Sequence, residues 1–369
     1  MQKYILVHIV PPTTKPEQAK IELKEAMSLI KTLRSGKVIQ IIQRRGNPHP
    51  ATYIGTGKAA EIAALIQKNN IDVVIINAQV KPTQLYKLTK MYWEINPKIQ
   101  VWDRIDLILH IFDKHAVSAE AKLQIELARM RHMGPRVYGL AQQLGRQAGG
   151  IGTRGIGETN VELMKRHWRD AIKKTTEKLK KQEQQRTKQL QNRKKHGLQT
   201  ISIVGYTNAG KTTLFNLLTN KEKIEKDELF VTLDTTTGKM YAPKLQRTLL
   251  VADTIGFIQS LPPNLIMAFK STLLESIHAD LLLHVVDASD PQLHEKIMVV
   301  NDILHDIGVE KTKPTILLLN KIDELEPYQR KNLEKIVDYN DHRTSVFISA
   351  QTGEGIGGLK TTITIMLQK

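Results

Sequence analysis

The chain contains no cysteine, and no apolar run in it is long enough to cross a bilayer. The first absence excludes disulfides and thiolate metal sites, and it is typical of proteins from a reducing compartment. The second predicts a protein without a membrane span. The N-terminus also lacks the basic-then-apolar layout of a secretory signal peptide. We therefore expect a cytoplasmic protein, and at 369 residues we expect two or three domains.

Acidic residues are scarce in the first half of the chain, and this scarcity produces the whole net charge of +17. Residues 1–164 contain 23 Lys and Arg against 13 Asp and Glu, and residues 165–196 contain 13 against 3. Residues 197–369 contain 18 against 21. A basic half beside a nearly neutral half favours a polyanionic partner, for which nucleic acid is the simplest choice. Charge that served solubility alone would be spread along the whole chain.

Residues 1–112 alternate apolar extended runs with segments of helical spacing. Such alternation with short connections predicts a small parallel α/β domain. The stretch Tyr53–Lys58 precedes a helix and could hold a phosphate, but it lacks P-loop spacing, so we interpret it as a structural loop. The expected strands are 5–10, 38–43, 72–77 and 99–103, and the expected helices are 17–33, 58–70, 82–93 and 104–112.

Residues 113–196 follow a different pattern. Apolar residues recur at three-to-four spacing in two stretches, and the second stretch runs on into a stem rich in Lys and Gln. This pattern predicts an antiparallel hairpin of two amphipathic helices.

The connection between these two helices, residues 134–157, contains eight of the 22 glycines and no acidic residue. It has little to bury, so we expect it to be disordered in the free protein. Because glycine permits close backbone approach and arginine supplies phosphate forks and stacking planes, we predict a loop that inserts into RNA. A flexible connector is the alternative interpretation. The predicted RNA contacts are Arg136, Arg146, Arg154, Lys173 and Lys174.

A strand, a glycine loop and a helix start follow one another at 201–213, in the order that a P-loop requires. Gly205 and Gly210 let the backbone curl so that its N–H groups point at phosphate oxygens. Lys211 would reach the β- and γ-phosphates, and the Thr212 hydroxyl would bind Mg²⁺. The predicted loop residues are Gly205, Tyr206, Thr207, Asn208, Ala209, Gly210, Lys211, Thr212 and Thr213.

Three further motifs follow apolar strands, and the carboxyl ends of parallel strands meet at one edge of a sheet. In the first motif, Asp253 would bind Mg²⁺ through a water, and the Gly256 N–H would contact the γ-phosphate. A threonine-rich segment from Phe230 to Thr237 precedes it and could change its order. The predicted binding residues of these segments are Phe230, Val231, Thr232, Leu233, Asp234, Asp253, Thr254, Ile255, Gly256, Asn320, Lys321, Ile322, Asp323, Ser349, Ala350 and Gln351.

The motif Asn320–Asp323 indicates which base is bound. The Asp323 carboxylate can accept from both N1–H and the 2-amino group of guanine, and adenine offers no such donor pair. Lys321 would lie along the base plane, Asn320 would tie neighbouring loops together, and the Ala350 amide would face O6. Together with the P-loop, these motifs predict a guanine-nucleotide switch.

One residue that many GTPases use for hydrolysis is missing. Position 257, directly after the Asp-x-x-Gly motif, holds Phe, and Phe cannot orient an attacking water as Gln does. We therefore expect slow intrinsic hydrolysis that a partner accelerates. Asn208 occupies the P-loop position that binds K⁺ in potassium-activated GTPases, so K⁺ is a candidate second cofactor beside Mg²⁺.

The combination resembles the HflX GTPases of the Obg–HflX group, and the resemblance covers essentially the whole chain. It implies that Thr232 completes the Mg²⁺ shell begun by Thr212 and Asp253, with Thr236 and Thr237 as lesser candidates. Lys211, Thr232 and Gly256 then form the catalytic set, and an apolar residue after Asp-x-x-Gly is a family trait. The matching segments are Gly205–Thr212, Phe230–Asp234, Asp253–Phe257 and Asn320–Asp323, with Tyr53–Lys58 and Gly155–Glu162 upstream.

The resemblance implies an α/β protein of three parts. A small α/β domain (1–112) and a basic helical hairpin (113–196) precede a P-loop GTPase domain (197–369), whose mostly parallel sheet carries helices on both faces. The implied function is a monomeric factor that binds GTP and GDP and associates with the large ribosomal subunit. It would contact rRNA near the peptidyl transferase centre and split or rescue stalled ribosomes under stress.

Two other functions stay open, namely a ribosome-assembly GTPase and a nucleotide-regulated RNA chaperone. Assembly GTPases often append an RNA-binding module after the G domain, and here little sequence follows Gln351. A tRNA-modification GTPase ends in a reactive cysteine, which this chain lacks. The family's N-terminal region is associated with an ATP-dependent activity, but this sequence shows no convincing second P-loop.

Overall fold

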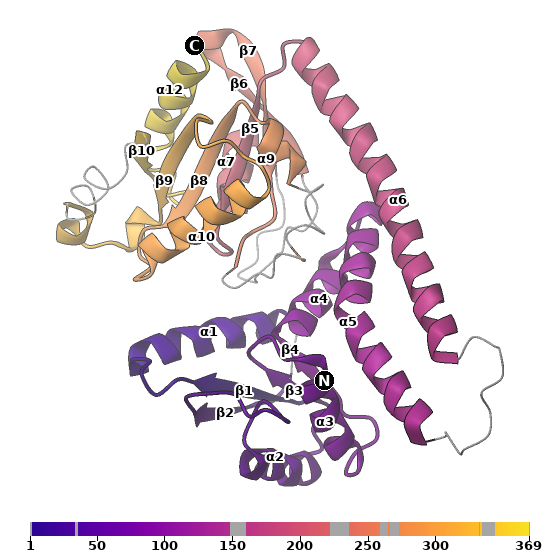
Figure 1. The fold of residues 1–369 in the computed structure, drawn as a ribbon. Coiled ribbons are helices and arrows are strands. Elements are labelled where there is room, and N and C mark those ends of the chain that lie inside the picture. The colour runs from indigo at the N-terminus through magenta and orange to yellow at the C-terminus, as the bar shows by residue number, and fades with distance from the viewer. Residues whose placement is uncertain are drawn as a thin grey trace. The chain divides into compact units, whose positions relative to one another are not determined.

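The protein is described by a computed structural model, drawn in Figure 1. It covers residues 2–33, 36–147, 160–221, 236–258, 265, 273–331, 333 and 344–368, with the backbone alone at 137–147, 160 and 161. Contacts divide the chain into two compact units. Unit 1 consists of Met1–Lys114 and Ile125–Lys178, and unit 2 consists of His115–Gln124 and Leu179–Lys369. Among the helices described, none combines the length and the hydrophobicity that a membrane span needs.

Unit 1 contains a parallel four-stranded sheet in the order β2-β1-β3-β4. Its strands are rich in β-branched residues, and β3 is buried at every position, as expected for a sheet covered on both faces. On one face, Ile62 and Leu88 of the helices pack against Val7 and Val74 of the strands. The elements are β1 (Tyr4–Val10), α1 (Pro16–Thr32), β2 (Val38–Arg44), α2 (Thr56–Asn69), β3 (Val73–Ile76), α3 (Pro82–Trp93), β4 (Gln100–Asp103) and α4 (Arg104–His115).

Two long helices follow, α5 (Ala119–Gln147) and α6 (Asn160–Lys195). The Trp168 indole N–H of α6 donates to the Met130 carbonyl of α5 at 2.9 Å, which joins the two helices within unit 1. The predicted hairpin region is divided between the two compact units. The start of α5, up to Gln124, and the end of α6, from Leu179, belong to unit 2.

The predicted loop from residue 134 is wrong for residues 134–147, which continue α5 through Pro135. The apolar residues Val137, Leu140 and Leu144 keep helical spacing there, a signal that the high glycine content masked. The rest of the predicted loop, 148–157, lies outside the described residues.

The α5 helix is tied to the end of the unit 1 sheet by a buried cluster of charges. The Arg136 guanidinium donates to Asp106 at 2.6 Å and to Asp103 at 2.9 Å. The His132 Nε2 lies 3.1 Å from a carboxylate oxygen of Asp103 and 3.4 Å from one of Asp106. Burial alone would lower the pKa of His132, but these two carboxylates raise it to about 9. The cluster thus places Arg136 and His132 against two carboxylates, with Arg136 Nη2 and His132 Nε2 themselves 2.5 Å apart.

The raised pKa of His132 predicts that unit 1 loses stability as the pH rises. Unfolded His has a pKa of about 6.5. The protonated form therefore stabilises the fold fully below that pH, and its contribution of up to about 3 kcal/mol disappears as the pH passes 9. The three tryptophans, at positions 93, 102 and 168, all lie in unit 1, so their fluorescence during urea unfolding reports on this unit. His132→Gln should flatten the pH dependence between 6.5 and 9, and an unchanged slope would contradict the assignment.

Unit 2 is built on a six-stranded sheet in the order β10-β9-β8-β5-β7-β6, in which β6 and β7 are antiparallel and the other neighbours are parallel. This confirms the predicted, mostly parallel GTPase-type sheet. The elements are β5 (Thr200–Gly205), α7 (Lys211–Thr219), β6 (Thr236–Ala242), η1 (Pro243–Leu245), β7 (Arg247–Asp253), α9 (Leu274–His278), β8 (Leu281–Asp287), α10 (Leu293–Asp306), β9 (Thr315–Asn320), η2 (Ile322–Glu324), β10 (Thr344–Phe347) and α12 (Ile356–Leu367).

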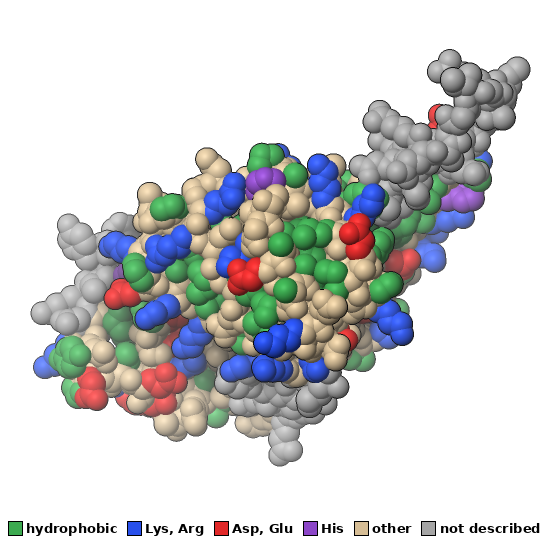
Figure 2. All heavy atoms as spheres, turned by 90° about the horizontal axis from the view of Figure 1, so that it is seen from below, with side chains coloured by type: hydrophobic (Ala, Val, Ile, Leu, Met, Phe, Trp, Pro, Cys, Tyr) green, Lys and Arg blue, Asp and Glu red, His purple; other side chains and the backbone are tan. Residues whose placement is uncertain are grey.

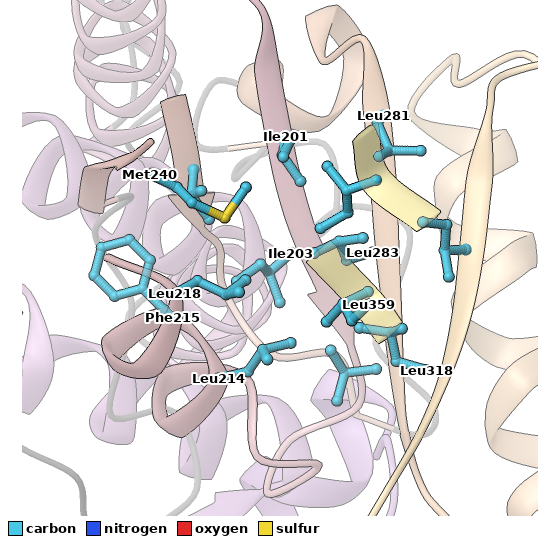
Figure 3. Close-up of a cluster of buried hydrophobic side chains, with 14 of the residues drawn as sticks. Ile201, Ile203, Leu214, Phe215, Leu218, Met240, Leu281, Leu283, Leu318 and Leu359 are labelled. Carbon is cyan, nitrogen blue, oxygen red and sulfur yellow. The ribbon is translucent and has the colours of Figure 1, made fainter. Parts of the chain in front are cut away.

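The main core of unit 2 lies between this sheet and helices α7 and α12 (Figure 3). Ile203 and Leu283 of the central strands meet Leu214 and Phe215 of α7 and Leu359 of α12, and all five are fully buried. Because this core packing holds β5 in position, it also fixes where the loop at the carboxyl end of β5 begins.

Candidate guanine-nucleotide site

The loop between β5 and α7 requires glycine at both of its ends. Gly205 has a φ of 150°, and a Cβ there would lie 2.2 Å from the Val285 carbonyl oxygen. Gly210 has a φ of 90°, and a Cβ there would lie 2.2 Å from Asn320 Nδ2. Any side chain at either position would collide with a neighbouring strand or its loop. The backbone therefore curls in the way predicted for a P-loop.

Lys211 is buried at the start of α7, and its ammonium donates to the Tyr206 carbonyl at 2.6 Å. Burial lowers the pKa of Lys211 to about 8, an effect that Asp253 opposes. The Thr207 hydroxyl in the same loop is buried without a hydrogen-bond partner among the described residues. A buried cation and an unused hydroxyl donor in one loop at a helix start fit a bound phosphate.

Thr212 and Asp253 are brought together from α7 and β7. The Thr212 hydroxyl donates to an Asp253 carboxylate oxygen at 3.2 Å, and Asp253 is fully buried. A hydroxyl and a carboxylate beside a phosphate site are the hard oxygen donors that Mg²⁺ prefers. The residues present therefore fit Mg²⁺, which P-loop GTPases generally use to neutralise phosphate charge. The third predicted ligand, Thr232, and the whole segment Phe230–Asp234 lie outside the described residues.

The segment after Asp253 is joined to the P-loop by backbone pairing. The Thr207 N–H donates to the Phe257 carbonyl at 2.7 Å, and the Phe257 N–H donates to the Gly205 carbonyl at 3.1 Å. At Gly256, a Cβ would lie 3.0 Å from the Lys211 ammonium, so a side chain there would enter the phosphate site. Phe257 is itself 1% exposed and offers no polar group, so it cannot hold a water.

Asn320 links the loops that carry the predicted base-binding residues. Asn320 is buried, donates to the Ala209 carbonyl at 2.8 Å and accepts from the Ala350 N–H at 2.9 Å. It thereby links the P-loop to the loop after β10. Asp323 is exposed on η2, where its carboxylate can meet a ligand.

Sequence reasoning missed Asp287, the last residue of β8. Its carboxylate lies 2.6 Å from the Lys321 ammonium and accepts from the Ser289 hydroxyl at 2.7 Å. Lys321 has a φ of 65°, and the ion pair holds its side chain beside the strand end. Its position in the sequence could have revealed it, because Asp287 ends a buried strand at the same sheet edge as the other motifs.

The remaining predicted residues take several environments. The Lys296 ammonium lies over the Tyr206 ring, 4.6 Å from the ring centre. The buried Thr254 hydroxyl donates to the Ile203 carbonyl at 2.7 Å. Asn208 is exposed and has a φ of 62°. Buried positions are Ala209, Ile255, Ile322 and Ser349, whereas Thr213 is half-buried and Gln351 exposed.

Three of the five predicted RNA contacts, Arg136, Lys173 and Lys174, have side chains among the described residues. Arg136 is occupied by the ion pairs with Asp103 and Asp106, and Arg154 lies outside the described residues, as does the side chain of Arg146. Lys173 and Lys174 are exposed on α6.

Comparison with known proteins agrees with this site. Residues 20–113 match the N-terminal region of the GTP-binding GTPases, residues 115–193 match their middle region, and residues 200–321 match the family described as 50S ribosome-binding GTPases. The structure is similar to that of a GTP-binding protein from the hyperthermophilic archaeon Sulfolobus solfataricus in complex with GDP. That likeness has a TM-score of 0.52 and 26% sequence identity over 99% of this chain and 98% of the other.

Two curated relatives carry the name GTPase HflX. The protein from Caldanaerobacter subterraneus subsp. tengcongensis is 42% identical over 98% of this chain and 80% of its own length. The protein from Escherichia coli K12 is 39% identical over 98% of this chain and 82% of its own length. Both the fold and the relatives show a P-loop GTPase that binds guanine nucleotides and hydrolyses GTP. The chain therefore belongs to the HflX family of GTPases.

Proposed function

We propose that the protein uses GTP to associate with the large ribosomal subunit and to split or rescue stalled ribosomes in the cytoplasm. The observation that carries this proposal is the match of residues 200–321 to the 50S ribosome-binding GTPases, next to a helix whose charge suits RNA. Residues 165–196, which make up most of α6, contain 13 basic residues against 3 acidic ones. Rigid helices that display cations bind phosphate backbones without reading sequence.

The excess charge is densest in the stem helix α6, because residues 165–196 carry the same excess of ten basic residues as the whole of residues 1–164. On the face of the molecule drawn in Figure 2, Lys and Arg side chains are scattered, with Asp and Glu side chains between them. Lys173 and Lys174 of α6 are exposed and are the described residues that we propose for rRNA contact. Because such binding releases counterions, the association should weaken steeply as salt is raised.

Within the nucleotide site we propose one role for each group. Lys211 neutralises the β- and γ-phosphates, and the Gly256 N–H responds to the γ-phosphate. Thr212 and Asp253, with Thr232, hold Mg²⁺, which supplies charge neutralisation on the phosphates. Asn320, Lys321, Asp323 and Ala350 select guanine.

Co-sedimentation with isolated large ribosomal subunits tests the association. The full chain should pellet with subunits in the presence of a non-hydrolysable GTP analogue and bind about tenfold or more weakly with GDP. Lys211→Ala should abolish this nucleotide dependence, whereas Lys360→Ala, an exposed lysine on α12, should leave it intact. Absence of the chain from the pellet in every nucleotide state would refute the ribosomal function and favour a free RNA chaperone.

We propose K⁺ as a second cofactor at Asn208, and the prediction is faster hydrolysis in K⁺ than in Na⁺. A cation beside the developing phosphate charge should speed hydrolysis by about tenfold or more. Asn208→Gly is the informative variant, because glycine accepts the φ of 62° and removes the side chain together with its amide oxygen. It should erase the difference between the two salts and keep GDP affinity. Equal wild-type rates in K⁺ and Na⁺ would reject the site.

A further inference from the structure

The later turns of α6 face α9 (Leu274–His278) and β6 (Thr236–Ala242) of unit 2. A pocket of about 300 Å³ lies between them. Its lining includes Arg186, Arg193 and three glutamines of α6, Glu120 of α5, Thr237 of β6 and Glu275 of α9. These lining residues all belong to unit 2. The pocket is therefore lined mostly by long polar side chains, in contrast to the packed apolar core on the sheet.

Glu275 is the most buried charge in this pocket. Its side chain is 3% exposed and lies 3.2 Å from the Arg193 guanidinium and 3.8 Å from that of Arg186. The same Arg193 nitrogen, Nη1, also donates to the second carboxylate oxygen at 3.4 Å, so both oxygens of Glu275 share one donor. Arg186 in turn donates to Glu120 at 3.2 Å. A buried carboxylate strongly disfavours the loss of its cations, so α9 and α6 should move together.

Glu275 and Thr237 both connect this pocket to the nucleotide site. The next residue, Ser276, is fully buried, and its hydroxyl lies 2.9 Å from that of Ser202 on β5, the strand that leads into the P-loop. Thr237 pairs with Ala252, and its neighbour Thr236 pairs with Asp253. The stem therefore pairs with α9 and shares a pocket with β6, and these two elements contact the strands β5 and β7 that carry the phosphate and Mg²⁺ groups.

We propose that Glu275 is a positioning residue that couples the stem helix α6 to the nucleotide state through Arg186 and Arg193. When α9 and β6 shift between the GDP and GTP states, the ion pairs carry the shift to α6. A polar pocket lets these long side chains re-pair without repacking a core. Because such coupling is reciprocal, a partner that binds α6 changes the preference of the site for GTP over GDP. This gives the proposed ribosome factor a route from its arm to its nucleotide site, but the coupling is testable without ribosomes.

The ratio of the dissociation constants for GDP and a non-hydrolysable GTP analogue tests the coupling in the full-length chain. Glu275→Gln and Arg193→Gln should each change this ratio by about fivefold or more, and the double variant should add little to either. Arg330→Gln is the matched control, because its pair with Glu354 at 2.8 Å is exposed and lies away from the pocket. If the ratio stays within twofold of wild type while the melting temperature falls, Glu275 is only structural and the proposal is wrong.

A second measurement needs no variant. Hydrogen exchange of wild-type amides in 183–195 should differ by about fivefold between the GDP and GTP-analogue states, because the stem is the receiving element. Identical exchange in both states would overturn the proposal even if the variants failed to fold. Failure of ribosome binding with a positive result here would refute the proposed function and keep the coupling.

Discussion

Asp323→Asn should lower the affinity for GTP by about 100-fold or more and create affinity for xanthosine triphosphate. The carboxylate can accept two hydrogen bonds from guanine, and each hydrogen bond to a charged group contributes about 1.5–3 kcal/mol. Asparagine presents an amide N–H₂ in place of one acceptor, which would face the guanine 2-amino group donor to donor. Xanthine carries a carbonyl at that position and accepts from the amide instead.

Competition among GTP, xanthosine triphosphate and ATP for the empty site measures this switch. Asp323 is exposed, so its replacement should leave the fold unchanged. Glu324→Gln is a suitable control, because the neighbouring carboxylate accepts from Ser289 and is not assigned to the base. Unchanged GTP affinity in Asp323→Asn would show that the base does not lie against η2 (Ile322–Glu324).

Arg136→Met should lower the free energy of unfolding of unit 1 by about 3–5 kcal/mol. Methionine keeps much of the apolar volume but leaves Asp103 and Asp106 with His132 as their remaining partner in the cluster. Asp103 is fully buried, and the loss of Arg136 leaves two carboxylates against the single imidazole of His132, so one buried negative charge is no longer paired. Arg131→Met, on the same helix but exposed, should change the free energy by less than about 0.5 kcal/mol.

Urea unfolding followed by tryptophan fluorescence separates these variants, since all three tryptophans lie in unit 1. Equal midpoints for Arg136→Met and Arg131→Met would contradict the structural role of the cluster. The same pair of variants also informs RNA binding. Loss of ribosome association in Arg136→Met without loss of stability would instead support the direct RNA contact predicted from the sequence.

The nucleotide site was largely predictable because its signals are local. Each motif follows a buried strand, and the ends of parallel strands necessarily meet at one edge, so Lys211, Asp253 and Asn320 converge without any knowledge of the tertiary fold. Asp287 was missed because its role, holding Lys321, depends on a neighbouring strand and not on a spacing within its own segment.

The structure of α5 and α6 was less predictable, because it depends on contacts between residues far apart in the sequence. Glycine content indicated a loop from residue 134, but Arg136 is held by carboxylates about 30 residues earlier and α5 continues. Within the basic stem, Lys173 and Lys174 were predicted as RNA contacts. In the structure, Arg186 and Arg193 of the same helix face Glu275. Charge alone could not predict this pairing, because the sequence does not show which side of α6 is covered.

Light scattering of intact bacterial ribosomes mixed with the full-length chain tests the proposed function most directly. With GTP, scattering should fall as ribosomes separate into subunits. With GDP, or with Lys211→Ala and GTP, it should stay constant, because the phosphate-dependent state is not formed. Constant scattering with GTP, under conditions where the nucleotide is shown to be bound, would contradict ribosome splitting.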